Sequence, residues 1–259
     1  MLGDSGFETT PMIELPIVDD FREVLPSHDC SYLADRTARF DYRVIYELTA
    51  DQYDHLLARG WRRHGLHVFR PVCGGCSECR SLRVPIQSFS PSKSQRRTMR
   101  RNNEISVKVQ SPSISQEHID IFNRYHADMA VRRNWREHAT TPGDYYEAFL
   151  CGRYSFEREF LYFDGTKLIA VGIVDVTERY ASSVYFFHDP DYRENALGVF
   201  SMVSELAYLK QMGVQHHYLG YWIEPCPSMA YKNRYRPHEI LERYVGDNEQ
   251  PVWRESSHD

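Results

Sequence analysis

Apolar and polar residues alternate along several short segments in the first half of the chain. Residues 42–48 and 104–110 place an apolar side chain at every second position, and residues 67–70 and 82–89 are short runs rich in apolar residues. A repeat of two puts these side chains on one face of an extended chain, as in a strand with one buried face. We therefore predict four strands here.

Two short helices are predicted near these strands from their capping residues. Thr49 and Gln52 have the spacing of a capping box, in which each side chain bonds the backbone N–H of the other residue. Ser92 or Ser94 is expected to cap a second helix that continues to Asn102.

The second half of the chain shows longer periodic segments. Ile119, Phe122 and Met129 have helical spacing, and Asp164-Gly165 is a turn signal between two apolar runs. The expected elements are a helix around residues 119–129, strands at 160–163, 168–176 and 181–188, a helix at 195–212, a strand at 217–223 and a short helix at 228–235. Three successive strands followed by a helix and a strand predict a mostly antiparallel sheet with helices packed on it.

A break at Ser111-Pro112-Ser113 separates the two halves and predicts a domain boundary. We expect residues 1–110 to form an N-terminal cysteine-containing α/β region, within which residues 1–26 are a partly ordered leader. Residues 111–259 are expected to form the second domain. The predicted fold class is therefore α+β.

Composition excludes several classes of protein. The chain has 259 residues, 42% of them hydrophobic, which is enough for one large domain or two modest ones. No apolar run approaches the ~18 residues of a membrane span, so no membrane partner is expected. The N-terminus lacks the basic and apolar regions of a signal peptide, and we expect a cytoplasmic protein. Oligomeric state is not predicted.

Positive charge is concentrated in one segment of an otherwise acidic chain. Residues 59–101 contain 11 Lys and Arg residues and one acid, whereas the whole chain has a net charge of −5. On the helix expected after Ser92, four arginines lie on roughly one face, which could bind the phosphates of a nucleic-acid backbone together with a nearby lysine. They are Lys93, Arg96, Arg97, Arg100 and Arg101. A merely solvated helix surface is the alternative.

Three cysteines precede this basic helix with the spacing of a metal knuckle. Two residues separate each of Cys73, Cys76 and Cys79 from the next, and Cys30 is the natural fourth ligand if the fold brings it near. Zinc and an iron–sulfur cluster both accept four thiolates, so the sequence does not separate them. Three free thiols in a basic loop are the alternative.

Two further segments are candidate substrate sites. Arg193-x-x-Ala196-x-Gly198 is similar to the acyl-donor loop R/Q-x-x-G-x-G/A of the GCN5-related N-acetyltransferase superfamily, although Ala196 replaces its first glycine. That replacement weakens the case for coenzyme A, whose pyrophosphate needs close approach to the backbone. The segment 218–241 combines tyrosines and a tryptophan with Lys232, Arg234 and Arg236, which are suited to a nucleotide end or a carboxylate.

With these features in place, the chain resembles the arginyl-tRNA–protein transferase family, and within it the short bacterial aspartate/glutamate leucyltransferases. The resemblance runs from about Cys30 to Arg243. It rests on the segments CSYLADR, PVCGGCSECRSLRVPIQSFSPSKSQRR, YFFHDPDYRENALGVFSM and YLGYWIEPCPSMAYKNRYRP. It implies a GCN5-related N-acetyltransferase-like second domain. It also implies transfer of leucine, or of arginine as in eukaryotic members, from tRNA to a protein that begins with Asp or Glu. The product would be an N-degron.

The resemblance and the residues together give each candidate a role. The basic residues Lys93, Arg96, Arg97, Arg100 and Arg101 would bind tRNA phosphates. Arg193 and Gly198 would hold the tRNA 3′ end, and Lys232, Arg234 or Arg236 would pair with the acceptor carboxylate. The residues that would orient the amine or relay its proton are Tyr221, Glu224, His188 and Asp189. Aminolysis of an activated ester requires no cofactor and no acyl-enzyme.

Three alternatives remain open from the sequence. Arginine as the donor would require a buried carboxylate in the side-chain pocket. A coenzyme A-dependent N-acetyltransferase would leave the basic helix unexplained. If the chain were a non-catalytic RNA-binding protein with a metal knuckle, the loop of Arg193 and the aromatic and cationic segment would have no assigned function.

Overall fold

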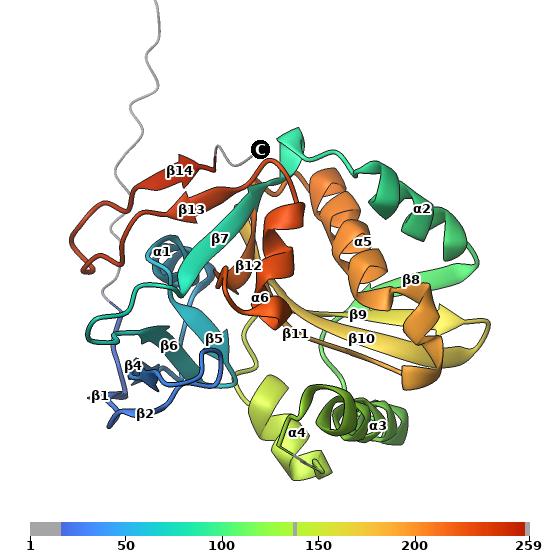
Figure 1. The fold of residues 1–259 in the computed structure, drawn as a ribbon, viewed down its shortest axis with the longest axis horizontal. Helices are drawn as coiled ribbons and strands as arrows, with labels where there is room; N and C mark the ends of the chain where they lie inside the picture. The colour runs from blue at the N-terminus through green and yellow to red at the C-terminus, as the bar shows by residue number, and fades with distance from the viewer. Residues whose placement is uncertain (1–16, 137–138, 257–259) are drawn as a thin grey trace, which may run out of the picture.

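Two β-sheets of unequal size form the frame of the computed structural model, which describes residues 17–136 and 139–256. The large sheet has the strand order β14-β13-β7-β12-β11-β10-β9-β8 and the smaller one the order β1-β4-β6-β5, with β2 and β3 as a separate pair (Figure 1). Within the described residues, β11 and β12 form the single parallel pair. This confirms the predicted mixed α+β class with a mostly antiparallel sheet.

The elements follow in chain order. The strands before the middle of the chain are β1 (Phe21–Val24), β2 (His28–Asp29), β3 (Thr37–Ala38), β4 (Phe40–Val44), β5 (Arg62–His64), β6 (His67–Pro71), β7 (Arg80–Pro85) and β8 (Ile105–Gln110). Those after it are β9 (Glu157–Asp164), β10 (Lys167–Val176), β11 (Tyr180–His188), β12 (His216–Trp222), β13 (Glu239–Leu241) and β14 (Trp253–Glu255). The α-helices are α1 (Ala50–Ala58), α2 (Lys93–Arg101), α3 (Gln116–Arg133), α4 (Pro142–Phe149), α5 (Leu197–Gln211) and α6 (Pro227–Ala230). Short 3₁₀ helices are η1 (Ile86–Ser88), η2 (Pro190–Asn195) and η3 (Tyr231–Arg234).

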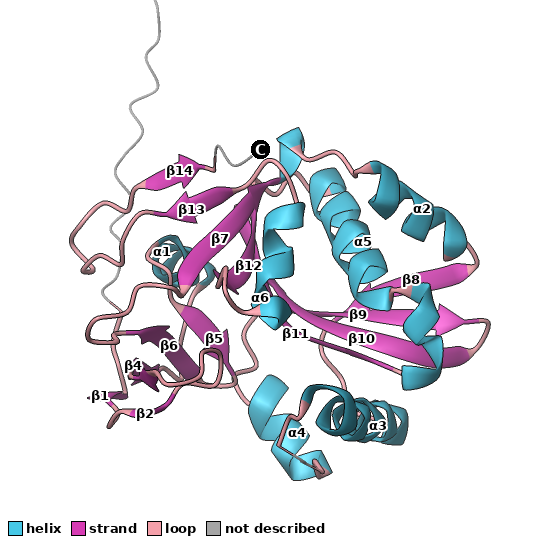
Figure 2. Ribbon diagram, in the orientation of Figure 1, coloured by secondary structure: helices cyan, strands magenta, loops and turns pink. Residues whose placement is uncertain are grey.

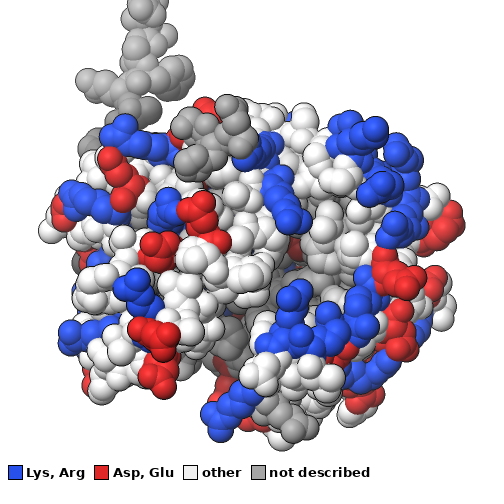
Figure 3. All heavy atoms as spheres, in the orientation of Figure 1, with Lys and Arg blue, Asp and Glu red and all other residues white. Residues whose placement is uncertain are grey.

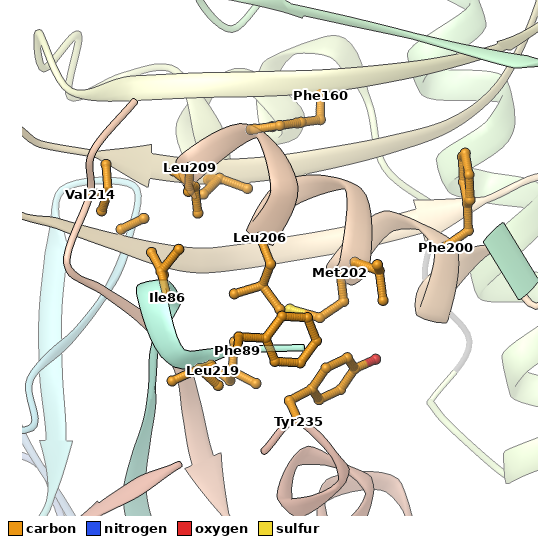
Figure 4. Packing of buried hydrophobic residues seen from close by; sticks show 14 of the residues in the cluster. Ile86, Phe89, Phe160, Phe200, Met202, Leu206, Leu209, Val214, Leu219 and Tyr235 are labelled. Atoms are coloured by element: carbon orange, nitrogen blue, oxygen red, sulfur yellow. The ribbon is translucent and has the colours of Figure 1, made fainter. Parts of the chain in front are cut away.

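Helices cover both faces of the large sheet. Figure 2 shows α2, α5 and α6 on one side and α3 and α4 on the other. Side chains of β10 alternate between the two cores, because Ile169 packs with the α5 cluster and Leu168 with the α3 and α4 cluster. On the α5 side, Met202 and Leu206 lie close to Phe89, Leu219 and Tyr235 (Figure 4). This packing fixes α5 beside the end of β12.

Capping explains where the first helices begin. Thr49 and Gln52 form the predicted capping box of α1, and Ser92 with Gln95 forms the same arrangement on α2. The strand expected at residues 42–48 is β4, which ends at Val44 because the chain then turns into the cap of α1. The strand expected at residues 82–89 ends at Pro85 and continues as η1.

The break at Ser111-Pro112-Ser113 lies between two neighbouring strands of one sheet. Before it is β8 and after α3 and α4 comes β9, and these two strands pair over six residues from Ile105↔Asp164 to Gln110↔Glu159. Strand β7 also joins this sheet. The expected division at residues 110 and 111 therefore falls within the large sheet.

Two remaining expectations concern the N-terminal leader and membrane-spanning helices. Residues 1–16 of the expected leader lie outside the described residues, while residues 21–24 form the edge strand β1. Within the described part of the chain, none of the helices combines the length and apolar character that a membrane crossing requires.

Candidate functional site

The site lies where β11 and β12 separate. The two parallel strands pair only from Tyr180↔His216 to Ser182↔Tyr218, although both continue further. Beyond that point β11 stays paired with β10, and β12 stays paired with β7. The large sheet is therefore open between them, with backbone groups of both strands available along the gap.

A cavity of about 700 Å³ fills this gap and extends to the small sheet. Five aromatic residues contribute to its walls, namely Phe21, Tyr32, Tyr42, Phe69 and Tyr221. The remaining lining residues are Leu25, Val44, Arg62, Arg63, His64, His67, Ser183, Val184, Leu219, Gly220, Met229 and Lys232. Among the described residues that line it, none is Asp or Glu. The cavity therefore has apolar walls and positive charge without a balancing carboxylate on its surface.

Arg62 holds the two strands where they part. One guanidinium nitrogen donates to the carbonyl oxygen of Ser183 on β11, and another donates to that of Tyr218 on β12 at 3.4 Å. The residue is 8% exposed. Its position satisfies carbonyls that the open sheet leaves unpaired and brings a buried cation into the cavity.

Lys232 supplies a second cation from η3. Its ammonium donates to the carbonyl oxygen of Tyr221 at 2.8 Å, and Met229 Sδ lies 3.6 Å away. Burial, aided by repulsion from Arg62, lowers the pKa of Lys232 to about 7. Gly220 separates the two cations, since a Cβ there would lie 3.4 Å from both Arg62 Nε and Lys232 Nζ.

A buried carboxyl group lies behind the cavity. Ser201 Oγ donates to Glu205 at 2.6 Å, and Ser183 Oγ lies 2.8 Å from His217 Nε2, which is 3.8 Å from Glu205. Burial raises the pKa of Glu205 to about 7 and lowers that of His217 to about 3. Ser183 thus connects the cavity wall to a carboxyl group that exchanges its proton near neutral pH.

The structure does not bring the four candidate proton-transfer residues together. Tyr221 lines the cavity, and its hydroxyl donates to the carbonyl oxygen of Phe69 at 3.2 Å. Glu224 is exposed and pairs with Arg80 at 3.4 Å. His188 is the last residue of β11 and Asp189 follows it, so both lie beyond Ser183 and Val184, the residues of this strand that line the cavity.

Asp189 has a structural role at that end. Its carboxylate lies 2.9 Å from Lys167 and 3.0 Å from Arg124, and it accepts the backbone N–H of Asp191 at the start of η2. Burial opposes ionisation, but the Lys167 hydrogen bond and Arg124 lower the pKa of Asp189. Burial lowers the pKa of His188. A carboxylate held by two cations is a poor proton acceptor.

Of the three residues expected to bind the acceptor carboxylate, the cavity contains one. Lys232 lines it, whereas Arg234 and Arg236 are exposed and lie outside the lining. Arg62 was missed by sequence reasoning, because it belongs to the basic segment whose charge was attributed to tRNA binding. Nothing in the sequence marks this arginine as buried.

The loop of Arg193 leads directly into α5. Arg193 pairs with Asp128 of α3, and Ala196 adopts a left-handed conformation with φ +54° as the N-cap of α5. Left-handed backbone favours glycine, which is the residue that the similar acyl-donor loop has at this position. Gly198 lies in the first turn of α5, where a Cβ would meet the ring of Phe186 at 3.7 Å.

The basic helix α2 is anchored beside this loop. Asn102 Nδ2 donates to the carbonyl oxygen of Asn195 at 2.9 Å, and Arg101 donates to that of Glu194. The other basic residues of its outer face are exposed, namely Lys93, Arg96, Arg97 and Arg100. Figure 3 shows Lys and Arg gathered over α2, with a second basic group below it on the same face.

The four cysteines lie near one another. Burial and the neighbouring thiols of Cys73, Cys30 and Cys76 raise the pKa of Cys79 to about 12. Cys73 Sγ also accepts the backbone N–H of Arg39 at 3.4 Å. In the part of the chain that the structure describes, however, no three potential ligands are arranged to hold a metal ion. Binding of zinc or an iron–sulfur cluster by these thiols stays a prediction.

Comparison with known sequences gives matches over both halves of the chain. Residues 28–97 match the family model for the N terminus of arginine-tRNA-protein transferase, and residues 117–242 match the model for its C terminus. The chain is 36% identical over 224 residues to an aspartate/glutamate leucyltransferase from Helicobacter hepaticus, covering 86% of this chain and 93% of that protein. The corresponding protein of Hahella chejuensis is 36% identical over 220 residues, covering 84% and 92%.

Comparison with solved structures gives weaker likenesses. The structure of L-PGS from Bacillus licheniformis aligns with a TM-score of 0.42 and 13% sequence identity, covering 68% of this chain and 58% of that one. A score this low does not support an assignment.

Proposed function

The chain belongs to the arginine-tRNA-protein transferase family, and from this premise we propose that it transfers leucine from leucyl-tRNA to proteins that begin with Asp or Glu. It is an aminoacyltransferase, as its relatives are. The observation that carries the proposed specificity is the cavity between β11 and β12, which combines aromatic walls with no lining carboxylate. Of its three buried basic residues, Arg63 pairs with Asp175 and Glu157, whereas Arg62 and Lys232 are held by backbone carbonyl oxygens.

The acceptor's acidic side chain is suited to the cationic end of this cavity. Arg62 and Lys232 flank Gly220 and would pair with an Asp or Glu carboxylate that enters there. Ion pairs are strong where water is excluded and the partners are already positioned. A neutral acceptor side chain would leave both cations unpaired.

The donor side chain is suited to the apolar walls. Leucine would pack against aromatic rings such as those of Phe21, Tyr42 and Phe69. An arginine side chain would bring a further positive charge into a space already lined by Arg62, Arg63 and Lys232. The absence of Asp and Glu among the described lining residues therefore favours leucine as the donor.

The chemistry is aminolysis of the aminoacyl ester. The acceptor ammonium first loses a proton, and its nitrogen attacks the ester carbonyl carbon to form the new C–N bond. The C–O bond to the ribose then breaks, the nitrogen releases a second proton, and the ribose oxygen takes up a proton. A free α-amino group has a pKa of about 7.7–8.0, so roughly a tenth is already uncharged at pH 7. Positioning is the enzyme's main contribution.

Direct attack leaves no covalent intermediate on the protein. Labelled leucyl-tRNA incubated with the protein but without an acceptor should give no protein-bound label after denaturation. Stoichiometric label on the protein would replace direct attack with an acyl-enzyme route.

The surface around α2 and the loop of Arg193 would bind the tRNA. The exposed arginines of α2 match phosphate geometry, and α2 is tied to the loop that precedes α5. The same loop, with Ala196 at the glycine position, supports a GCN5-related N-acetyltransferase-like second half whose acyl donor is an aminoacyl ester. The product would be an N-degron made in the cytoplasm.

A transfer assay with paired donors tests the proposal. Purified protein receives labelled leucyl-tRNA or arginyl-tRNA, with peptides that begin with Asp, Glu or Ala. Leucine should be transferred to the Asp and Glu peptides. Transfer of arginine instead would correct the donor. No transfer from either donor would reject the proposal, and acetylation of the peptides by acetyl coenzyme A would replace it.

A further inference from the structure

An exposed aromatic patch lies next to the cavity and has no role in the scheme above. It consists of four residues. Tyr125 lies on α3, Trp135 lies just after the end of α3, His188 ends β11, and Tyr231 lies on η3. The Tyr125 ring contacts Trp135 at 6.2 Å and His188 at 5.2 Å between centroids, edge to face in both cases. Tyr125 is also near enough to Tyr231 to raise the pKa of its hydroxyl electrostatically.

Two rings of this patch remain open to solvent. Trp135 is 38% exposed and Tyr231 is 40% exposed. The hydroxyl end of Tyr231 is nonetheless enclosed, since burial and then Tyr125 raise its pKa to about 12. An aromatic ring with a fixed edge and an open face presents a flat surface on which another ring can stack.

Positive charge borders the patch. Arg132 and Arg193 converge on Asp128, which leaves one positive charge in excess among the three groups. Arg132 and Arg133 are close enough to Tyr125 to act on its hydroxyl electrostatically. Stacking rings beside arginines are the combination that binds unpaired nucleotides, whose bases stack while their phosphates pair.

The patch continues into the cavity. Tyr231 directly precedes Lys232, whose ammonium lies in the cavity. On β11, Val184 lines the cavity and His188 belongs to the patch, so the open edge of one strand runs from one to the other. A strand that advances about 3.3 Å per residue covers roughly 13 Å between them, which is the length of a few nucleotides.

We propose that this patch binds the unpaired 3′-terminal nucleotides of the aminoacyl-tRNA by stacking, so that the aminoacyl ester reaches the cavity. This inference rests on the proposed function for the identity of the RNA. It assigns Trp135 and Tyr231 as contacts to bases, while α2 contacts the phosphates of the duplex.

Binding of two RNAs tests the inference without any catalytic step. Affinity is measured for leucine tRNA without its amino acid and for the same tRNA lacking its unpaired 3′ nucleotides. Combining Trp135→Ala with Tyr231→Ala should weaken binding of the complete tRNA by about 10-fold or more, and leave the shortened tRNA unaffected. Trp135→Phe should retain most of the affinity because it keeps an aromatic ring.

A matched control is Tyr46→Ala, which removes an aromatic ring that is 59% exposed outside the patch. It should not change the affinity for either RNA. The inference would be overturned if the Trp135 and Tyr231 double variant bound both RNAs with equally reduced affinity, or bound the complete tRNA with unchanged affinity. Failure of leucine transfer alongside 3′-dependent binding would reject the proposed function and leave the patch as a nucleotide site.

Discussion

Single residues determine the charge of the cavity. Arg62 and Lys232 are both buried, and each is held by backbone carbonyl oxygens rather than by a carboxylate. Arg62 therefore offers its charge to a ligand, and a carboxylate that enters the cavity would favour the charged form of Lys232, whose pKa burial lowers to about 7. At this scale the structure differs most from what the sequence predicted, since Arg234 and Arg236 were grouped with Lys232 but lie outside the cavity.

Glu205 gives a prediction about pH and stability. Its pKa is about 7 in the folded protein, above the ordinary value of 4.5, because it is buried. Between these values the folded state holds a proton that the unfolded state has lost, so stability falls as pH rises from about 4.5 to 7. Above pH 7 the ionised, buried Glu205 lowers the free energy of unfolding by on the order of 3 kcal/mol. Glu205→Gln should remove this part of the pH dependence and stabilise the protein near pH 8.

Urea unfolding between pH 5 and 8 measures the effect. Glu157, whose pKa burial also raises to about 7, keeps part of the slope in both proteins. The exposed Glu242 supplies the control, because Glu242→Gln should leave the curve unchanged. Identical pH dependence of wild type and Glu205→Gln would show that the buried carboxyl is not the source.

The residue-level site could be predicted only in part, for a physical reason. Lys232 and Tyr221 were found because they lie in one short aromatic and cationic segment. Arg62 is about 170 positions from Lys232 in the chain, and the two meet only because the small sheet packs against the opening between β11 and β12. The periodicity of a single segment carries no information about contacts between residues so far apart in the sequence.

At the scale of elements, the decisive feature is the separation of β11 from β12. Strands were predicted at residues 181–188 and 217–223, and capping residues predicted α1 and α2. Alternation does not show which strands pair or how far. The three-residue parallel pairing that leaves the sheet open depends on α5 crossing from one strand to the other.

Helix α2 gives a prediction about tRNA binding. Arg97 and Arg100 are exposed on its outer face. Replacing both with alanine should raise the KM for leucyl-tRNA and should lower the slope of log affinity against log salt by about 1.5, because each lost phosphate contact removes roughly 0.7–0.9. The measurement is tRNA binding over a series of salt concentrations.

A control of equal charge is available at the other end of the large sheet. Arg243→Ala with Arg254→Ala also removes two exposed arginines, which pair with Glu249 and Glu242. This double variant should keep the wild-type slope. If the α2 double variant also kept the wild-type salt dependence of tRNA binding, α2 would not be the phosphate-binding helix.

At the scale of the whole molecule, a buried ionic cluster fastens the small sheet to the large one. Arg63 of β5 pairs with Asp175 of β10 at 2.5 Å and with Glu157 at 3.0 Å. Tyr53 of α1 also donates to Asp175, at 2.6 Å. Because the cavity is bounded by both sheets, this cluster determines its shape.

Removing one member of the cluster should be costly. Asp175→Ala leaves the buried Arg63 with a single carboxylate partner, Glu157, and we expect a loss of about 3–5 kcal/mol in the free energy of unfolding. The exposed pair of Arg254 and Glu242, 3.0 Å apart, is the comparison, and Arg254→Ala should cost less than about 1 kcal/mol. Chemical unfolding of both variants decides the matter. Similar losses would mean that the buried cluster does not join the sheets.

The central claim is that buried positive charge in the cavity selects acidic acceptors. The direct measurement is kcat/KM for leucine transfer to two peptides that differ only in beginning with Asp or Asn, using wild type, Lys232→Met and Arg236→Ala. Wild type and Arg236→Ala should prefer Asp, and Lys232→Met should lose roughly 10- to 100-fold of that preference, the value of a charged hydrogen bond. An unchanged preference in Lys232→Met, or an equal loss on both peptides, would contradict the account.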